Sequence, residues 1–312
     1  MSRAMAVVRS AVLLPATIAA LGAAVPLQAQ NFEIRLKKAW VKTYADRTSI
    51  DVSMDVRHSH KHANQVGRSG DDGVMHFSGV ASDVGLPFVA EVVNAGLPGE
   101  QAAAATIIQH EGSNGVLAIT GAWRLWFEHP SQLQTQGDSN AFSPDNTNPD
   151  HSFEIHPASR VGQHDLGGSF IPIAGYTAYT ADTAFRYFDG SKVTIKASRS
   201  GISIRSKKLK YNYVEFRIEL ATAPIAVQDG FVVLARVLDS HGEEVADGLR
   251  RMVFVQGTSA ANAVRNAAAG DQLRVLGIPR ISLNKVLTLV QNNGTQQFEA
   301  QLPYEMIIVG VF

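Results

Sequence analysis

The sequence contains no cysteine, and this absence removes several kinds of chemistry at once. Without cysteine the chain forms no disulfide, so its stability must come from packing alone. It also has no thiol nucleophile and no thiolate ligand for zinc or an iron–sulfur cluster. Any metal site would therefore be built from histidine, carboxylate and backbone oxygen ligands.

Net charge is absent as well, because 28 Lys and Arg balance 28 Asp and Glu in 312 residues. A balanced chain has no global field that attracts polyanions, and there is no strong nucleic-acid signal; any such affinity would be local. The sequence also has no Gly-x-Ser-x-Gly elbow, no phosphate-binding Gly-rich loop and no dinucleotide-binding fingerprint. Serine hydrolases, NTPases and dinucleotide enzymes are therefore unsupported.

Residues 1–29 differ in composition from the rest and predict a signal peptide. Arg3 and Arg9 are their only charges, and residues 11–25 are small and apolar. This pattern is typical of an export signal, which we expect to be cleaved after Ala29. The alternative is a membrane anchor, which is disfavoured because two prolines shorten the apolar run below the ~20 residues that cross a bilayer. No later segment is a spanning candidate, so we expect a periplasmic or secreted protein.

Alternation of apolar and polar residues dominates the remaining sequence. Residues 50–56 and 214–220 place apolar side chains at every second position. This period is that of a strand with one face on a core and the other in water. Further strands are expected at 192–196, 201–205, 231–238 and 252–255. The pattern predicts a mainly β protein.

Helical signals are few and short. Residues 101–109 follow a turn and end near Gly112, and they predict one helix. Residues 259–269 predict a second helix, with Thr258 or Ser259 as its N-cap and a glycine just past its end.

Each predicted helix is followed by a strand with a central glycine, Gly121 in one case and Gly277 in the other. Strands, a short helix and then a bent strand are the plan of a small Greek-key barrel of the OB type. We therefore predict a mainly β fold with two short helices, made of two small Greek-key (OB-like) barrel domains in tandem. The alternative is coincidence, because identity between the halves is too low to establish a repeat.

The domain organisation follows from composition. Residues 162–179 are rich in glycine and place a boundary near residue 175. We expect a His-rich OB-like β domain at 30–175, with a long polar loop at 131–149, and a second β domain at 176–312.

Histidine is concentrated in the first of these domains, because nine of the ten histidines precede residue 165. Neutral imidazoles with nearby acids are what a divalent metal site without cysteine needs. The ion would be zinc, manganese or iron. The candidate metal ligands are His58, His60, His76, His151, Glu154 and His156.

Two short patterns supply most of these ligands. Residues 58–62 place three imidazoles alternately along the chain, and the alternative is an exposed polar loop. Within 151–157, a strand would direct Glu154 and His156 to the face opposite the core. These two side chains could bind one ion or act as a base and its orienting acid. The alternative is a surface strand that Pro157 ends.

The segment from Asp71 to Pro157 resembles a module of uncharacterised exported bacterial proteins that carry an aromatic-Glu-Ile-His-Pro motif. The resemblance rests on four short segments: Asp72-Gly73-Val74-Met75-His76, Val89-Ala90-Glu91-Val92-Val93, Thr120-Gly121 and Phe153-Glu154-Ile155-His156-Pro157. It implies an OB-like barrel and no established activity. It also implies that His76, Glu91, His151, Glu154 and His156 belong to one site. Val74 stands where the module usually has an acid, which puts any role of that position in doubt.

Two further segments are candidates for binding. Residues 138–150 are rich in oxygen-bearing side chains and could bind calcium, but they lack the glycine and terminal glutamate of an EF-hand loop, so a solvated loop is favoured. Residues 186–217 carry nine Lys or Arg against two acids. They could bind a polyanion or polysaccharide, with tyrosines as stacking surfaces. The alternative is a strand edge that lysines keep from pairing. The candidate ligand-binding residues are Tyr187, Lys207, Lys208, Lys210, Tyr211 and Tyr213.

Three functions remain open at this point. The absence of any catalytic motif favours an exported, non-catalytic binding module of OB-like type. The concentration of histidine supports the alternative, a metal-dependent hydrolase, for example of phosphodiesters, with a metal-bound water as nucleophile. A purely structural envelope component is a third reading, supported only by elimination.

Overall fold

The computed structural model describes residues 31–66, 72–138 and 144–312, and the predicted signal peptide lies outside them. Strands dominate these residues, as the alternation predicts. Among the described helices, none is long and apolar enough to cross a membrane.

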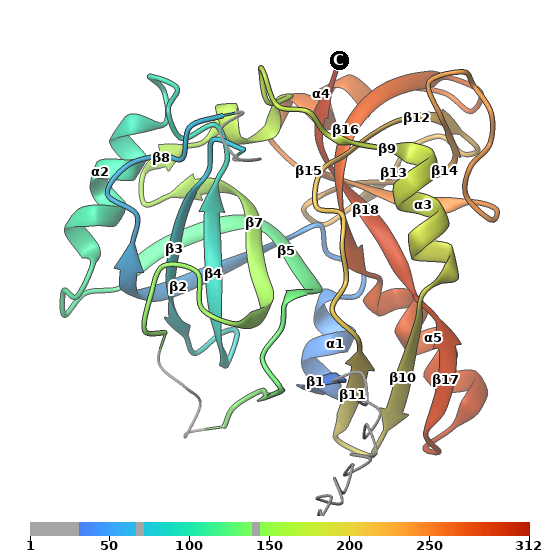
Figure 1. Cartoon of the computed structure of the whole chain (residues 1–312), viewed down its shortest axis with the longest axis horizontal. Coiled ribbons are helices and arrows are strands. Elements are labelled where there is room, and N and C mark those ends of the chain that lie inside the picture. The colour runs from blue at the N-terminus through green and yellow to red at the C-terminus, as the bar shows by residue number, and fades with distance from the viewer. Residues whose placement is uncertain (1–30, 67–71, 139–143) are drawn as a thin grey trace, which may run out of the picture. The chain divides into compact units, whose positions relative to one another are not determined.

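The first barrel is the blue and green group of strands in Figure 1. Its strands are, in chain order, β2 (Ser49–Ser59), β3 (Met75–Ala81), β4 (Leu86–Val92), β5 (Leu117–His129) and β7 (His151–Val161). They pair in the order β2-β3-β4-β7-β5, and β5 pairs back with β2. The closing pair of third and fifth strands, β4 and β7, is parallel. Helix α2 (Gln101–His110) lies between the third and fourth strands, where the sequence predicts a helix.

The second barrel has the same connectivity. Its strands are β12 (Val214–Leu220), β14 (Gly230–Leu238), β15 (Arg250–Val255), β16 (Gln272–Ile281) and β18 (Tyr304–Val311). They pair in the order β12-β14-β15-β18-β16, and β16 pairs back with β12. The third and fifth strands are again parallel, and α4 (Ser259–Val264) again precedes the fourth strand. Two closed five-stranded barrels in tandem confirm the predicted fold class.

A third sheet joins the two ends of the described chain. Its strands, in sheet order, are β17 (Phe298–Gln301), β10 (Lys192–Ala197), β11 (Gly201–Ser206), β1 (Phe32–Lys37) and β6 (Leu133–Thr135). Local patterns predict β10 and β11 but not the pairing of β11 with the distant β1 or of β10 with β17. Residues 31–312 form one compact unit, and the boundary near residue 175 stays a prediction.

Three helices are not predicted by the sequence pattern: α1 (Lys38–Tyr44), α3 (Ala181–Gly190) and α5 (Leu283–Asn293). α3 buries Phe185 and Phe188, but in the sequence its second half belongs to the basic segment because it carries the exposed Arg186. α5 buries Leu283, Val286 and Val290, which have the spacing of one helix face. This short pattern is hard to recognise in the sequence because apolar strand residues lie on either side of it. Predicted helix 259–269 is confirmed to Val264 with Thr258 as its N-cap. The remaining short elements are β8 (His164–Asp165), η1 (Gly167–Phe170), β9 (Tyr179–Thr180) and β13 (Ile225–Val227).

The fourth strands of the two barrels carry equivalent arginines. Arg124 lies three residues after Gly121, Arg280 lies three residues after Gly277, and neither side chain is exposed to solvent. Each arginine pairs with a glutamate on the fifth strand of its own barrel at 2.7 Å: Arg124 with Glu154, and Arg280 with Glu305.

These arginines also join the barrels to each other. Arg124 Nε donates to the carbonyl of Pro279 at 3.0 Å, and Arg280 Nη1 donates to the carbonyl of Trp123 at 3.0 Å. Each guanidinium therefore bonds to the residue that precedes the equivalent arginine of the other barrel. An approximate two-fold axis between the barrels requires this reciprocal pattern. An apolar cluster that includes Val74, Tyr213 and Ile278 lies beside these bonds.

Candidate functional site

A cluster of ionisable side chains lies on the outer surface of the first barrel and is buried there. Inward residues such as Phe77 and Phe153 fill the core, so their neighbours His76 and Glu154 point outward. Glu91 on β4 stands directly opposite His76 on β3 in the antiparallel ladder. Tyr213, from the segment that enters the second barrel, reaches this cluster.

The contacts of the cluster form one continuous network. His76 Nε2 lies 3.5 Å from Glu91, and His156 Nδ1 lies 3.3 Å from both Glu91 and Glu154. His151 Nε2 lies 2.9 Å from Glu154. The resemblance implies one site for these five residues, and the structure brings them together. His156 Nε2 lies 2.7 Å from the hydroxyl of Tyr213, so the network spans both halves of the chain.

Opposite charges in the network stabilise one another. Burial lowers the pKa of His76, but Glu91 and Asp72 outweigh it and raise that pKa to about 9, so His76 is protonated at neutral pH. Burial raises the pKa of Glu154, but Arg124 and His151 hold it well below its usual value. Two cations, His76 and Arg124, therefore face the two carboxylates of Glu91 and Glu154. Both ring nitrogens of His156 have polar neighbours, because Nε2 faces the hydroxyl of Tyr213 and Nδ1 faces Glu91 and Glu154.

Two of the predicted ligands, Glu154 and His156, are arranged with Glu91 so that the three could hold a metal ion. Ligand atoms of Glu91, Glu154 and His156 all lie within 4.8 Å of one another. Every one of the three side chains is buried. Each carboxylate is already engaged, because Arg124 and His151 contact Glu154 while His76 and His156 contact Glu91. A metal ion would have to replace these cations and protons.

The histidines of 58–62 lie at the edge of this cluster or outside it. The ring of His60 packs edge-on against the ring of His76 with centroids 4.9 Å apart. His58 is half-buried beside a bulge in β2, and His62 is exposed. The structure therefore brings His60 near the network but does not place His58 and His62 in it.

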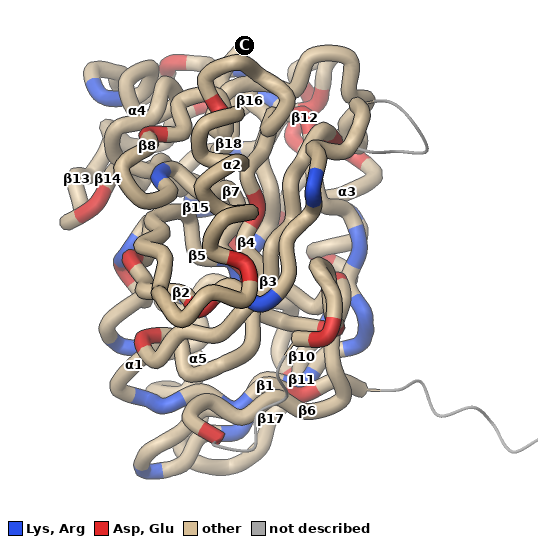
Figure 2. The backbone as a smooth tube through the Cα atoms, turned by 90° about the vertical axis from the view of Figure 1, so that its left-hand side faces the viewer, with Lys and Arg blue, Asp and Glu red and all other residues tan. Residues whose placement is uncertain are grey.

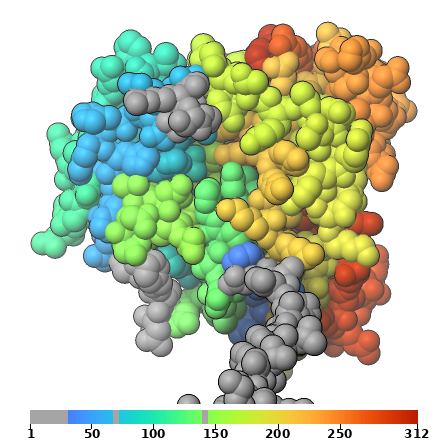
Figure 3. Space-filling view, in the orientation of Figure 1, coloured from blue at the N-terminus to red at the C-terminus, as the bar shows by residue number. Residues whose placement is uncertain are grey.

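A second candidate site is the surface around residues 207–211, called here the Tyr–Lys surface. Lys207, Lys208 and Lys210 are exposed. Tyr211 contacts Tyr187 and Tyr179 edge-on, with ring centroids 5.1 and 4.9 Å apart. Figure 3 shows this yellow and gold region on the visible face.

The backbone holds the Tyr–Lys surface in place. The N–H of Leu209 donates to the carbonyl of Phe127 at 2.7 Å, and the hydroxyl of Tyr187 donates to the carbonyl of Lys208. Tyr211 has a φ of 66°, a left-handed conformation that is unusual for a bulky residue. Tyr213, a sequence candidate, is not part of this surface because its side chain is fully buried against His156.

Sequence reasoning missed two groups that complete these sites. Arg124 neutralises Glu154, yet no local pattern marks an arginine on a predicted strand as buried. Tyr179 is 46% exposed and packs on Tyr211 from outside the basic segment. Only the proximity of β9 to the start of β12, a long-range pairing, places it there.

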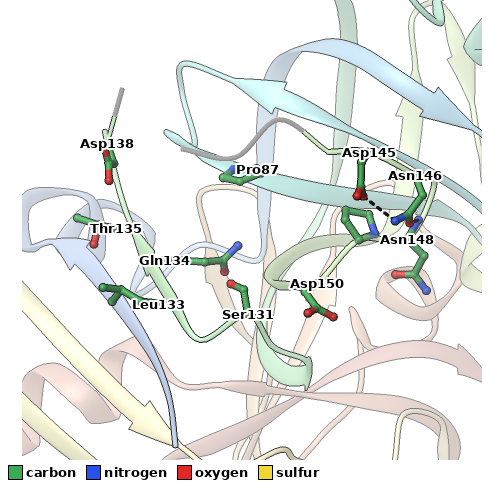
Figure 4. A pocket seen from close by; sticks show the side chains of 11 residues that line it. Pro87, Ser131, Leu133, Gln134, Thr135, Asp138, Asp145, Asn146, Asn148 and Asp150 are labelled. Atoms are coloured by element: carbon green, nitrogen blue, oxygen red, sulfur yellow. Dashed lines mark hydrogen bonds between the residues drawn. The ribbon is translucent and has the colours of Figure 1, made fainter. Parts of the chain in front are cut away.

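The oxygen-rich loop lines a pocket of about 600 Å³, shown in Figure 4. The carboxylates of Asp138, Asp145 and Asp150 lie on different sides of this pocket and do not converge. Asn146 donates to Asp145, and its own side-chain oxygen accepts the N–H of Asn148 at 2.9 Å. Loop residues thus bond to one another, as a solvated loop does, and no convergent calcium ligand set is formed by the described residues.

Glu33 is a largely buried acid on β1 of the third sheet, and it gives a testable pH dependence. Burial raises its pKa, but Arg205, Arg35 and Ser203 outweigh this and lower it to about 2. A depressed folded-state pKa contributes stability above the unfolded value near 4.5, and this is lost as the pH falls toward 2. Glu33→Gln should therefore cost about 2 kcal/mol at pH 7, a figure discounted because both arginines are half-exposed.

Urea unfolding of the wild type and Glu33→Gln from pH 7 to pH 2.5 measures this difference. The gap between the two proteins should close as the pH falls. A gap that stays constant with pH would show that the ion pairs of Glu33 contribute nothing to stability.

Comparison with known proteins does not assign the chain to a family. No protein-family model matches it, and no curated protein matches its sequence. A solved structure described as "Structure of murine DNA binding protein bound with ds DNA" is 10% identical, with 84% of this chain and 98% of that chain covered and a TM-score of 0.18. At that TM-score the likeness carries no argument.

Proposed function

We propose that this chain is an exported, non-catalytic binding protein that holds an acidic polysaccharide on the Tyr–Lys surface. The observation that carries the proposal is a set of exposed lysines with no acidic partner beside clustered tyrosines. Among the described residues, no carboxylate lies within ion-pair distance of Lys207, Lys208 or Lys210, nor of nearby Arg186. Some cations elsewhere on the surface, for example Arg205 and Arg274, do have such partners.

The chemistry of the surface suits an anionic chain of sugars. Unpaired ammonium groups attract carboxylate or sulfate substituents, and this attraction weakens as salt increases. Tyrosine rings offer an apolar face and a polar rim, which suits the mixed surface of a sugar ring. The close ring contacts of Tyr179, Tyr187 and Tyr211 hold these faces in fixed positions, so little side-chain freedom is lost on binding.

Calorimetric titration of the protein from residue 30 with polygalacturonate oligomers tests the proposal. The variant Lys207→Gln/Lys208→Gln/Lys210→Gln should bind at least about tenfold more weakly, because each lost contact costs a few tenths to one kcal/mol. The matched control, Arg57→Gln/Arg160→Gln/Arg265→Gln, removes three exposed positive charges from other elements and should bind like the wild type. Neutral malto-oligosaccharides should not bind.

Three outcomes would contradict the proposal. Equal weakening in both triple variants would indicate general charge attraction. Tighter binding of a single-stranded oligonucleotide would move the ligand class to nucleic acid. About one equivalent of zinc, manganese or iron by elemental mass spectrometry, lost in Glu91→Gln, would favour the metal-dependent hydrolase, whose supporting observation is the Glu91, Glu154 and His156 group.

A further inference from the structure

A hollow of about 650 Å³, called here the basic pocket, lies where the end of β1, helix α1, β6 and the β10–β11 turn meet. Its lining includes five basic side chains and no acidic one: Arg35, Lys37, Lys38, Lys42 and Arg199. Figure 2 shows the blue segments that carry lysine and arginine around the α1 and β1 labels. The basic pocket shares no lining residue with the Tyr–Lys surface.

Four of these five cations have no counter-charge among the residues that the structure describes. Arg35 pairs with Glu33 at 2.7 Å. In the described ranges, no carboxylate lies within ion-pair distance of Lys37, Lys38 or Lys42, and the same holds for Arg199. Like charges around one hollow repel each other, and an anion in that hollow relieves the repulsion.

The backbone beneath these side chains is fixed. The N–H of Lys37 donates to Gln136 Oε1 at 2.8 Å, and Gln136 Nε2 donates to the carbonyl of Val84 at 2.7 Å. Gln136 is 8% exposed, so this link between β1 and β6 is protected from water. On the other side, the N–H of Lys38 donates to the carbonyl of Ser200 at 2.8 Å.

The structure also shows what the ammonium group of Lys37 contacts. A Cβ atom at Gly137 would lie 2.7 Å from Lys37 Nζ, so the ammonium rests directly on that glycine. Gly137 has a φ of 79°, a left-handed conformation that glycine adopts without strain. The chain therefore leaves room at residue 137 for the cation of Lys37 beside the hollow.

We infer that the basic pocket binds a compact multivalent oxyanion. Its volume lies in the range of small-molecule sites, which is about 300–1,000 Å³. Tyrosine and other aromatic residues are absent from its lining, so it offers no stacking face for a base or a sugar ring. Lysines act as point charges that follow an anion in several orientations, which suits clustered phosphate or carboxylate groups. This site is independent of the Tyr–Lys surface and does not rest on the polysaccharide proposal.

Calorimetric titration with tripolyphosphate and with citrate tests the inference on the protein from residue 30. Lys38→Gln/Lys42→Gln/Arg199→Gln should bind tripolyphosphate at least about tenfold more weakly. The matched control is Lys207→Gln/Lys208→Gln/Lys210→Gln, which loses the same charge and should bind within about twofold of the wild type. Circular dichroism confirms that both variants fold, and the single variant Lys42→Gln, at an exposed position, serves if the triple variant does not.

The outcomes separate this site from the proposed function. Binding of both anions, or of tripolyphosphate alone, supports the basic pocket, and the second result assigns it to phosphate groups. Equal weakening in the two triple variants overturns it, because the attraction would then belong to the whole surface. If the wild type binds neither anion at millimolar concentration, the inference about the basic pocket is also wrong. If only polygalacturonate fails to bind, the proposed function is wrong and the basic pocket is unaffected.

Discussion

Replacing Arg280 with methionine should lower the free energy of unfolding by about 3–5 kcal/mol. Arg280 and its partner Glu305 are both completely buried. Burial lowers the pKa of Arg280 to about 10, so the guanidinium remains charged at neutral pH. Without it, Arg251 is the one counter-charge that Glu305 keeps among the described residues, and the Glu305 side chain is completely buried. The guanidinium also donates to the carbonyls of Arg47 and Trp123, and both bonds would be lost, although the carbonyl of Arg47 would keep the bond from the indole N–H of Trp123.

Chemical denaturation of Arg280→Met measures this loss, and Arg274→Met is the matched control. Both arginines lie on β16, and both contact a glutamate oxygen at 2.7 Å. The side chain of Arg274 is 51% exposed, so its pair with Glu215 should contribute less than about 1 kcal/mol. Equal losses in the two variants would mean that burial is not what makes the Arg280 pair important.

The sequence predicts the strands well where the pattern and the environment agree. Residues 50–56 and 214–220 alternate, and both form strands with one buried face in the structure. The plan of helix followed by a glycine-bearing strand, recognised twice, corresponds to two barrels of equal connectivity. Turn and capping residues mark these elements locally in the sequence. The elements can therefore be predicted without knowledge of long-range contacts.

Only part of the candidate site can be predicted from the sequence. Alternation correctly directs Glu154 and His156 away from Phe153 and Ile155. If residues 151–157 were a surface strand, this outer face would be exposed to water. In the structure, Tyr213 and the second barrel cover it. Alternation shows which face of a strand a side chain occupies, but it does not show what packs over that face. The burial of the network therefore cannot be predicted from the sequence.

The end of β7 shows a second limit. Proline has no N–H to donate, so Pro157 alone suggests that the strand stops there. The strand continues to Val161 because the β5–β7 register shifts on both sides of Gly121, which provides a bulge next to Pro157. Bulges depend on both strands, so one strand's sequence does not reveal them.

Gly121→Ala should therefore destabilise the first barrel by about 3 kcal/mol, because a Cβ at this bulge has no space. It would lie 2.5 Å from the carbonyl oxygen of Pro157, 2.7 Å from Ala158 Cα and 2.5 Å from Ile155 Cγ2. Two of these are backbone atoms, so the clash is relieved only by opening the β5–β7 ladder, on which Glu154 and His156 lie.

Thermal and urea unfolding of three glycine variants distinguishes this steric effect from a general loss of glycine. Gly277→Ala, at the equivalent place in the second barrel, would meet the ring of Phe216 at 3.0 Å and the carbonyl oxygen of Ile307 at 3.1 Å. These contacts are longer than those at Gly121 and need a shift of only a few tenths of an ångström, so the cost should be about 1 kcal/mol. Gly99→Ala projects into open space and should change stability by less than about 0.5 kcal/mol. If Gly121→Ala proved as stable as Gly99→Ala, the bulge would not need glycine, and the route by which β7 passes Pro157 would need another explanation.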